Sequence, residues 1–214
     1  ASEDLLCSRA IAQLAALAVR DSRLIDQVTR RLAELEAVNR VGAAMASHLD
    51  EDELCESVGD SLREIFGAGL VFVALYDEAE GKISLPYLWN EGRRQSHAPL
   101  RNGEGIVSKV IASGKPVYLG SRVEDKGLEL GAVDIRDRES LPRSWLGVPI
   151  ISGDRVLGAL SIQSFEKDRA FSIADIKLLQ ILASTASAGI QNARLRRKAV
   201  EAASPLASSG ASPV

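Results

Sequence analysis

Residues 144–164, SWLGVPIISGDRVLGALSIQS, decide the fold of this 214-residue chain. Two apolar runs of strand length flank Gly153-Asp154, and a glycine-containing turn between such runs is typical of an antiparallel hairpin. Apolar residues fill nearly every position of both arms, so we expect both faces of the sheet to be covered. The hairpin is therefore predicted to form the centre of the core, with helices on one side and loops on the other.

The composition argues against several classes of protein. The formal net charge is −3, without the basic bias that nucleic-acid binding requires. No apolar run reaches the roughly 20 residues that span a bilayer, and the N-terminus has no signal-peptide layout, so we expect a cytoplasmic chain with no membrane segment. The cysteines Cys7 and Cys55 are far apart and form no metal-binding spacing or disulfide framework. The last residues, SPLASSGASPV, have a disordered composition, and the whole resembles a fragment of a longer protein.

The N-terminal segment, residues 1–37, belongs to a long predicted helix that extends from about Leu5 to His48. Its apolar residues follow the 3, 4, 3, 4 spacing of a heptad seam, with an asparagine at one core position. Such a seam predicts a parallel homodimeric coiled coil in which the asparagine fixes the register. An amphipathic helix lying on its own domain is the alternative. The seam residues are Ile25, Val28, Leu32, Leu35 and Asn39.

Downstream, Asp50 and Glu53 form a capping box for a helix over residues 51–66. Strands are predicted at 70–76 and 82–90, followed by a more polar edge strand at 93–100. In the second strand every other residue is apolar, which indicates that one face is buried. The alternating residues are Ile83, Leu85, Tyr87 and Trp89.

Between the edge strand and the hairpin, we expect a helix over 106–113 and a short strand over 115–119. The charged residues 120–143 form a segment long enough to be a lid or binding loop, with a helical turn within 128–135. After the hairpin, Ser172 is the expected N-cap of a helix that ends near Ala203.

Four stretches together resemble the GAF family of small-molecule sensor domains over residues 38–195. They are the segment from Pro99 to Val107, the stretch 144–150 (SWLGVPI), the stretch 158–163 (GALSIQ) and the stretch 171–175 (FSIAD). The resemblance implies an α+β sandwich with an antiparallel sheet of about six strands. It also implies that the first and last helices lie on one face, with a ligand pocket under short helices and a long loop on the other. Family members usually dimerise through those flanking helices, and residues 196–214 would hold the end of the last helix and a disordered tail.

The chain departs from the cofactor-binding branches of that family. Gln163-Ser164 replaces the Asn-Lys pair of cyclic-nucleotide binders and Ile176 replaces their glutamate, which argues against a cAMP or cGMP site. Neither cysteine stands where a bilin would attach, and the pocket cysteines of the methionine-sulfoxide-reducing branch are missing. His48 and His97 lie in polar or helix-end contexts, which argues against haem, and no metal site is expected.

No catalytic motif occurs, so we expect a regulatory sensor of a bacterial-type signalling protein and not an enzyme. The pocket should bind a small molecule of unknown identity against an apolar wall, with arginines that receive an anionic group. The alternative for these residues is that the aromatics pack in the core and the arginines are solvated. The alternative functions are a ligand-free dimerisation spacer and a small pocket enzyme. The predicted ligand-binding residues are Tyr87, Trp89, Ile106, Tyr118, Arg136, Arg138, Arg143 and Trp145.

Overall fold

The computed structural model describes residues 50–90, 92–130 and 141–203, and some of the positions between 13 and 43. Contacts divide the chain into residues 1–36 and residues 37–214. The described positions of the first unit are helical, and Val28, Leu32 and Leu35 are exposed there. Of the other seam residues, Ile25 lies outside the described residues. Asn39, at the start of the second unit, is helical and exposed.

The second unit is built on one antiparallel sheet with the order β3-β2-β1-β7-β6-β5, and the short strand β4 also pairs with β2. The hairpin of residues 144–164 is confirmed: its arms pair in register from Ser144 opposite Ser164 to Ser152 opposite Arg155. It supplies the two strands between β1 and β5, at the middle of the sheet. The strands are β1 Leu70–Asp77, β2 Lys82–Asn90, β3 Arg93–Arg94, β4 Leu100–Arg101, β5 Val117–Leu119, β6 Ser144–Ser152 and β7 Arg155–Ser164.

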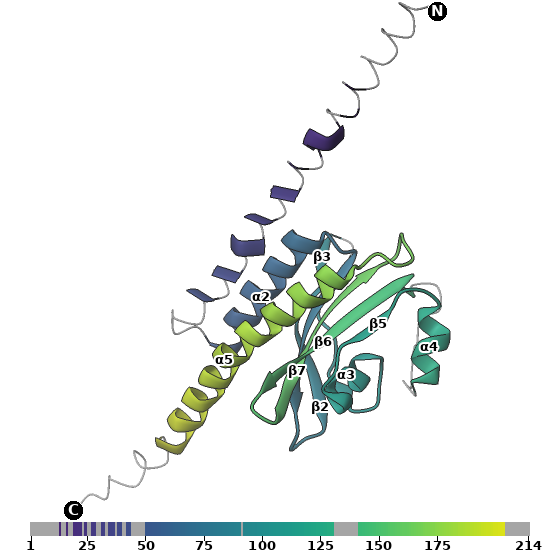
Figure 1. Ribbon diagram of the computed structural model, residues 1–214. Helices are drawn as coiled ribbons and strands as arrows, with labels where there is room; N and C mark the ends of the chain where they lie inside the picture. The colour runs from purple at the N-terminus through teal and green to yellow at the C-terminus, as the bar shows by residue number, and fades with distance from the viewer. Residues whose placement is uncertain are drawn as a thin grey trace, which may run out of the picture. The chain divides into compact units, whose positions relative to one another are not determined.

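Helices cover both faces of this sheet (Figure 1). The helices α2, Glu51–Phe66, and α5, Ile173–Ala203, lie side by side on one face, which we call the helix face. The shorter α3, Val107–Ser113, and α4, Val123–Glu129, contribute apolar side chains to the core on the opposite face. The predicted α+β sandwich is therefore confirmed.

Both long helices begin at caps that the sequence predicts. At the start of α2, the Asp50 carboxylate accepts the Glu53 backbone N–H at 2.8 Å, and the Glu53 carboxylate accepts the Asp50 N–H at 3.3 Å. Before α5, Ser172 and Asp175 bond reciprocally, with 2.7 Å between the Ser172 nitrogen and Asp175 Oδ2. Phe171 is buried just ahead of this cap. The Phe171 and Asp175 pattern is therefore explained by helix capping and packing.

Two core clusters fill the two sides of the sheet. The helix-face cluster joins α2 and α5 to side chains such as Leu146, Leu160 and Ile162 of the central strands. The opposite cluster joins α3 and α4 to the alternate residues, including Phe72 and Trp145. This division explains why both arms of the hairpin are apolar at nearly every position.

The helix α5 is long and apolar enough to cross a membrane by length and composition alone, over Ile173–Val200. Half of that apolar window is buried inside the domain, where Leu179, Leu182 and Ile190 are almost fully enclosed in the helix-face core. Packing in the helix-face core thus accounts for much of the hydropathy of α5.

Two predicted elements differ in the structure. The edge strand expected at 93–100 is two separate two-residue strands, β3 and β4, because this polar stretch has no alternating apolar side to bury. In the segment 120–143, a helix at Val123–Glu129 begins before the expected turn within 128–135, and Val123 of this helix is buried. Residues 131–140 lie outside the described residues.

Candidate functional site

The sheet face opposite α2 and α5, here called the site face, can be read row by row from the strand pairing. The first row crosses five strands at the end of the sheet where β1 begins. The second row lies two residues further along β1. The first row consists of Asn90, Leu70, Gln163, Trp145 and Leu119. The second consists of Leu88, Phe72, Ser161, Gly147 and Val117.

Polar side chains interrupt this otherwise apolar face at three positions. Ser161 is fully buried and Gln163 is 8 % exposed. The Oδ1 of Asn90 and the Oγ of Ser161 are both buried, and neither has a hydrogen-bond partner in the part of the chain that the structure describes. A buried polar atom without a partner costs about 1–3 kcal/mol, so two on one face need an explanation.

Trp145 lies flat along this face beside Ser161. A Cβ on Gly147 would lie 2.2 Å from the Trp145 indole, which shows that the ring covers the glycine two residues further along β6. Only glycine leaves room for this arrangement. The sequence WLG of the hairpin thus places an aromatic ring next to an unpaired hydroxyl.

The short helices close over the rest of the site face. Val107, Val110 and Ile111 of α3 pack against a part of the sheet where Ala74 and Ala159 are small. Small residues in the sheet let the helix approach closely. We therefore place the candidate site over the first two rows, beyond this contact.

Of the predicted apolar wall, Ile106 and Trp145 lie in the site-face core, both largely buried. The structure places Tyr87, Trp89 and Tyr118 in contact with the helix-face cluster instead. The prediction that these five residues share one wall is therefore wrong.

A β-bulge explains the error for Tyr87 and Trp89. The pairing of β1 with β2 changes register between Val73 and Leu75, so that Leu85 and Pro86 together face Ala74. An extra residue reverses the side to which the following side chains point. Ile83 and Leu85 consequently face α3, whereas Tyr87 and Trp89 face α2.

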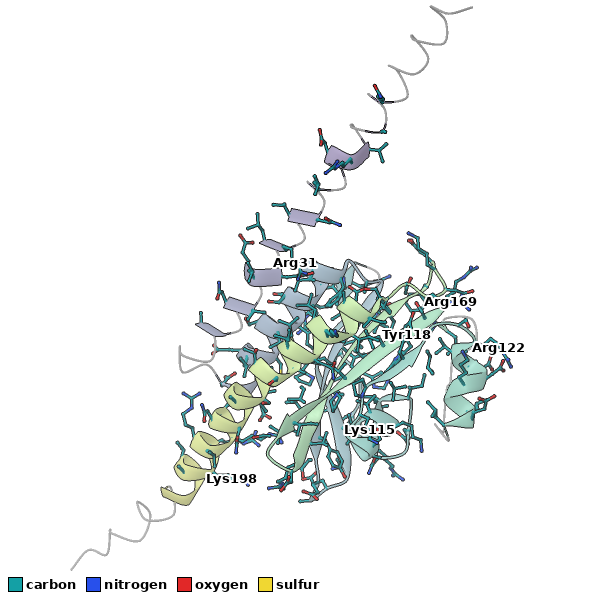
Figure 2. The ribbon with its side chains drawn as sticks, in the orientation of Figure 1. Arg31, Lys115, Tyr118, Arg122, Arg169 and Lys198 are labelled. Atoms are coloured by element: carbon teal, nitrogen blue, oxygen red, sulfur yellow. The ribbon has the colours of Figure 1, made fainter. Side chains whose placement is uncertain are left out.

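Tyr118 points to the helix face because its neighbours Val117 and Leu119 occupy the site face. It comes from the outer strand β5, near Arg169 (Figure 2). Its hydroxyl and the Arg169 Cγ each lie 3.2 Å from the place of a Cβ on Gly120.

Of the three predicted anion-binding arginines, only Arg143 lies among the described residues. Arg143 is exposed, and its backbone N–H donates to the Ser164 carbonyl at 2.8 Å. Arg136 and Arg138 lie outside the described residues. Asn90, Ser161 and Gln163 were missed, although the polar residues within the apolar run ALSIQ offered a signal for two of them.

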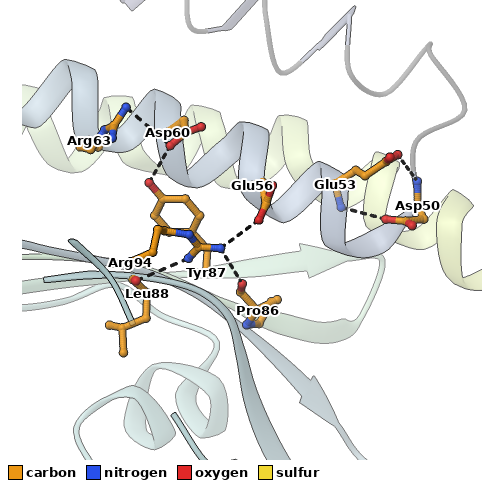
Figure 3. Close-up of polar contacts among 9 residues, drawn as sticks. All are labelled: Asp50, Glu53, Glu56, Asp60, Arg63, Pro86, Tyr87, Leu88 and Arg94. Atoms are coloured by element: carbon orange, nitrogen blue, oxygen red, sulfur yellow. Dashed lines mark hydrogen bonds and ion pairs between the residues drawn. The ribbon is translucent and has the colours of Figure 1, made fainter. Parts of the chain in front are cut away.

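On the other side of β2, a polar network ties the strand to α2 (Figure 3). The Tyr87 hydroxyl donates to Asp60 Oδ1 at 2.8 Å, and the Arg94 guanidinium lies 4.0 Å from the centre of the Tyr87 ring. Arg94 also donates to Glu56 at 3.1 Å and to the Pro86 carbonyl at 3.2 Å. Burial, and then the bond to Asp60, raise the pKa of Tyr87, so the phenol stays protonated and keeps donating.

The helices α2 and α5 are joined by an ion-pair cluster. Arg194 Nε donates to Glu51 at 2.6 Å, and Arg197 contacts the same carboxylate at 3.3 Å. These residues help to line a hollow of about 890 Å³ between the start of α2, the turn after β1 and the last turns of α5. Because Glu51 pairs with Arg194 and Arg197, and Glu80 pairs with Lys82, much of the charge that lines this hollow is already paired, and we place the candidate site elsewhere.

Cys55 lies in the helix-face core and not on the site face. Burial, followed by the nearby Glu51 carboxylate, raises the pKa of its thiol, which keeps it from forming a reactive thiolate. Among the described residues, no group of three His, Cys, Asp or Glu side chains could hold a metal ion. His97 is exposed.

Comparisons with known proteins identify the fold. The family model described as "GAF domain" matches residues 48–191, more than half of the chain. The nitrogen fixation protein VnfA of Azotobacter vinelandii is 27 % identical over 122 residues, which cover 56 % of this chain and 23 % of that protein. This chain thus spans about a quarter of the length of that curated relative.

Solved structures agree on the fold at low identity. The GAF domain of an Acinetobacter phosphoenolpyruvate-protein phosphotransferase gives a TM-score of 0.63 at 20 % identity, covering 75 % of this chain and 94 % of that one. Residues 122 to 287 of a methyl-accepting chemotaxis protein give 0.62 at 16 % identity, covering 72 % and 97 %. A free methionine-R-sulfoxide reductase from Neisseria meningitidis, in complex with its substrate, gives 0.62 at 23 %, covering 76 % and 91 %.

Proposed function

This chain belongs to the GAF domain family, and we propose that it is a regulatory module that senses a small molecule within a signal-transduction protein. The observation that carries the proposal is the pair of buried, unpartnered atoms, Asn90 Oδ1 and Ser161 Oγ, on the face away from α2 and α5. A ligand that forms hydrogen bonds with these two atoms would remove the free-energy cost of leaving them unpaired, and this gain would strengthen its binding. A regulatory setting is supported by the similarity to a nitrogen fixation protein and by the shared fold of a chemotaxis protein.

Strand β2 offers a route from the site to the helices. Its Asn90 faces the site, whereas its Tyr87 is bonded to Asp60 of α2. The strand β7, which carries Ser161, leads through a short loop into α5. An ion pair between Arg194 of α5 and Glu51 of α2 joins the two helices. A ligand that binds one arrangement of β2 and β7 more tightly would shift the packing of both helices.

Ligand occupancy is tested on the protein as purified. Native mass spectrometry should show a mass excess that is absent from the denatured spectrum. Unfolding, dialysis and refolding should remove it and lower the melting temperature, because a ligand that binds only the folded state stabilises it. Without a mass excess, and without a thermal shift across a panel of metabolites, the domain would be a ligand-free spacer and the sensing proposal would fail.

We also propose that the signal is read by a second copy of this chain. Exposed residues of α5 follow the same 3, 4 and 7 spacing as the seam of the N-terminal helix, with Ile181 51 % and Leu195 58 % exposed and Ser184 and Ala188 between them. Apolar and small residues at heptad spacing let two helices pack closely. We therefore propose this stripe as the dimerisation surface of the domain.

Charging the stripe should dissociate the dimer. The double substitution Ile181→Glu and Leu195→Glu places like charges at the seam, and we expect the dimer dissociation constant to rise at least tenfold, equivalent to about 1.4 kcal/mol. Light scattering coupled to gel filtration measures it. The control is Ile173→Glu, since Ile173 is also exposed, at 74 %, but stands at the first position of α5 off the stripe. A wild-type monomer, or a double variant that stays dimeric, would refute this interface.

A further inference from the structure

The polar atoms of the site face define the chemistry of the molecule that fits them. The ligand class inferred from these atoms rests on the sensing role proposed above. Every residue of the first two rows, from Asn90 to Leu119 and from Leu88 to Val117, is uncharged. A charged ligand buried against such a face would lose its hydration without gaining a counter-charge there, which costs several kcal/mol.

The hydrogen-bonding groups on this face are an amide oxygen, a hydroxyl and a second amide. The Asn90 Oδ1 accepts only, so it requires a donor from its partner, whereas the Ser161 hydroxyl both donates and accepts. Gln163, 8 % exposed, lies in the first row opposite Trp145 and two residues along β7 from Ser161, and its amide can both donate and accept. Neutral groups such as amides, phenols and alcohols can form hydrogen bonds with all three side chains.

The spacing of these groups sets the length of the molecule. Asn90 and Gln163 are separated by one strand, on which Leu70 lies between them. Two strand spacings amount to about 10 Å, and Ser161 stands two residues, or roughly 7 Å, along β7 from Gln163. Leu70 and Phe72 form an apolar floor between the polar groups, with the flat Trp145 indole at one side.

From this arrangement we infer that the site takes an uncharged, mostly apolar small molecule about 10 Å long, with a hydrogen-bond donor at the Asn90 end and an amide, hydroxyl or carbonyl group at the Ser161 and Gln163 end. The part of the ligand that lies against these two rows bears no phosphate and no carboxylate. Such a ligand differs from the anionic ligand that Arg136, Arg138 and Arg143 suggest in the sequence.

The test uses matched compounds on the refolded, ligand-free full chain. The probes are 6-hydroxy-2-naphthamide, the corresponding 6-hydroxy-2-naphthoate and the corresponding aminomethyl compound, which are alike in shape and differ in charge at neutral pH. We expect the amide to bind at least tenfold more tightly than either ion in isothermal titration calorimetry. Equal or tighter binding of an ion, or binding of none of the three, would overturn the ligand class. Sensing itself would still stand if the protein as purified carries a ligand.

Two variants separate a ligand site from a structural one. Asn90→Leu and Ser161→Ala remove the unpartnered atoms, so each should weaken binding of the amide at least tenfold. Each should also raise the melting temperature of the ligand-free chain by about 2–4 °C, because a buried polar group without a partner is lost. The matched control is Ser84→Ala, at an exposed serine of β2, which should change neither property. A lower melting temperature in both site variants would mean that buried water already satisfies the two atoms, and would overturn the inference.

Discussion

Replacing Gly158 with alanine should lower the free energy of unfolding by about 3–5 kcal/mol, a cost of the kind caused by severe overpacking. An alanine Cβ at this position would lie 1.9 Å from the Ala74 carbonyl oxygen and 3.0 Å from the Leu75 Cα. These are backbone atoms of the neighbouring strand at the centre of the sheet, so no side-chain rotation relieves the overlap. The strands β1 and β7 would have to separate locally, which breaks ladder hydrogen bonds that the buried backbone needs.

Urea unfolding followed by tryptophan fluorescence measures this change, because Trp89 and Trp145 are both packed in the fold. The matched control is Gly42→Ala, the same substitution at a helical glycine with no atom within 4 Å of the added Cβ. The control should be as stable as the wild type or slightly more stable. A Gly158→Ala variant within 1 kcal/mol of the wild type would contradict the close approach of β1 and β7.

The hairpin and the long helices could be predicted because each depends on local chemistry. The turn at Gly153, the capping box of Asp50 and the N-cap at Ser172 are encoded within a few residues, and the structure has all three. Apolar patterning then indicates which segments are covered on two faces. The fold class follows from these elements and their order.

The side-chain directions on β2 could not be predicted, because they depend on a non-local event. Simple alternation puts Ile83, Leu85, Tyr87 and Trp89 on one face. The bulge opposite Ala74 divides them into two pairs that face opposite sides. A bulge arises from the fit between two paired strands, and the sequence of one strand does not reveal it.

The polar residues of the candidate site were missed for a different reason. In the sequence, aromatic and arginine side chains indicate a ligand site, whereas Ser161 and Asn90 stand out only through burial without a partner in the described structure. Burial and hydrogen bonding are properties of the folded state, and both residues are common in exposed positions. Only the strand register shows that Asn90, Ser161 and Gln163 lie on the same face.

Gly59→Ala should destabilise the protein by about 2–3 kcal/mol, opposite in sign to the usual gain of up to about 1 kcal/mol for glycine to alanine within a helix. A Cβ on Gly59 would lie 2.2 Å from Cγ of Tyr87, so the α2 backbone rests directly on the phenol ring. The ring cannot retreat easily. Its hydroxyl is bonded to Asp60, and the Arg94 guanidinium covers the ring within 4.0 Å of its centre.

A double-mutant cycle tests whether the cost comes from this contact. Tyr87→Leu alone should destabilise the protein, because it removes a buried ring and the hydrogen bond to Asp60. In the double variant the added methyl no longer meets a ring, so the combined loss should be at least 1 kcal/mol smaller than the sum of the single losses. Urea unfolding gives all four free energies. Additive losses would mean that α2 and β2 adjust independently, and would also count against the proposed route from the site to α2, because that route runs through the contact of Tyr87 with α2.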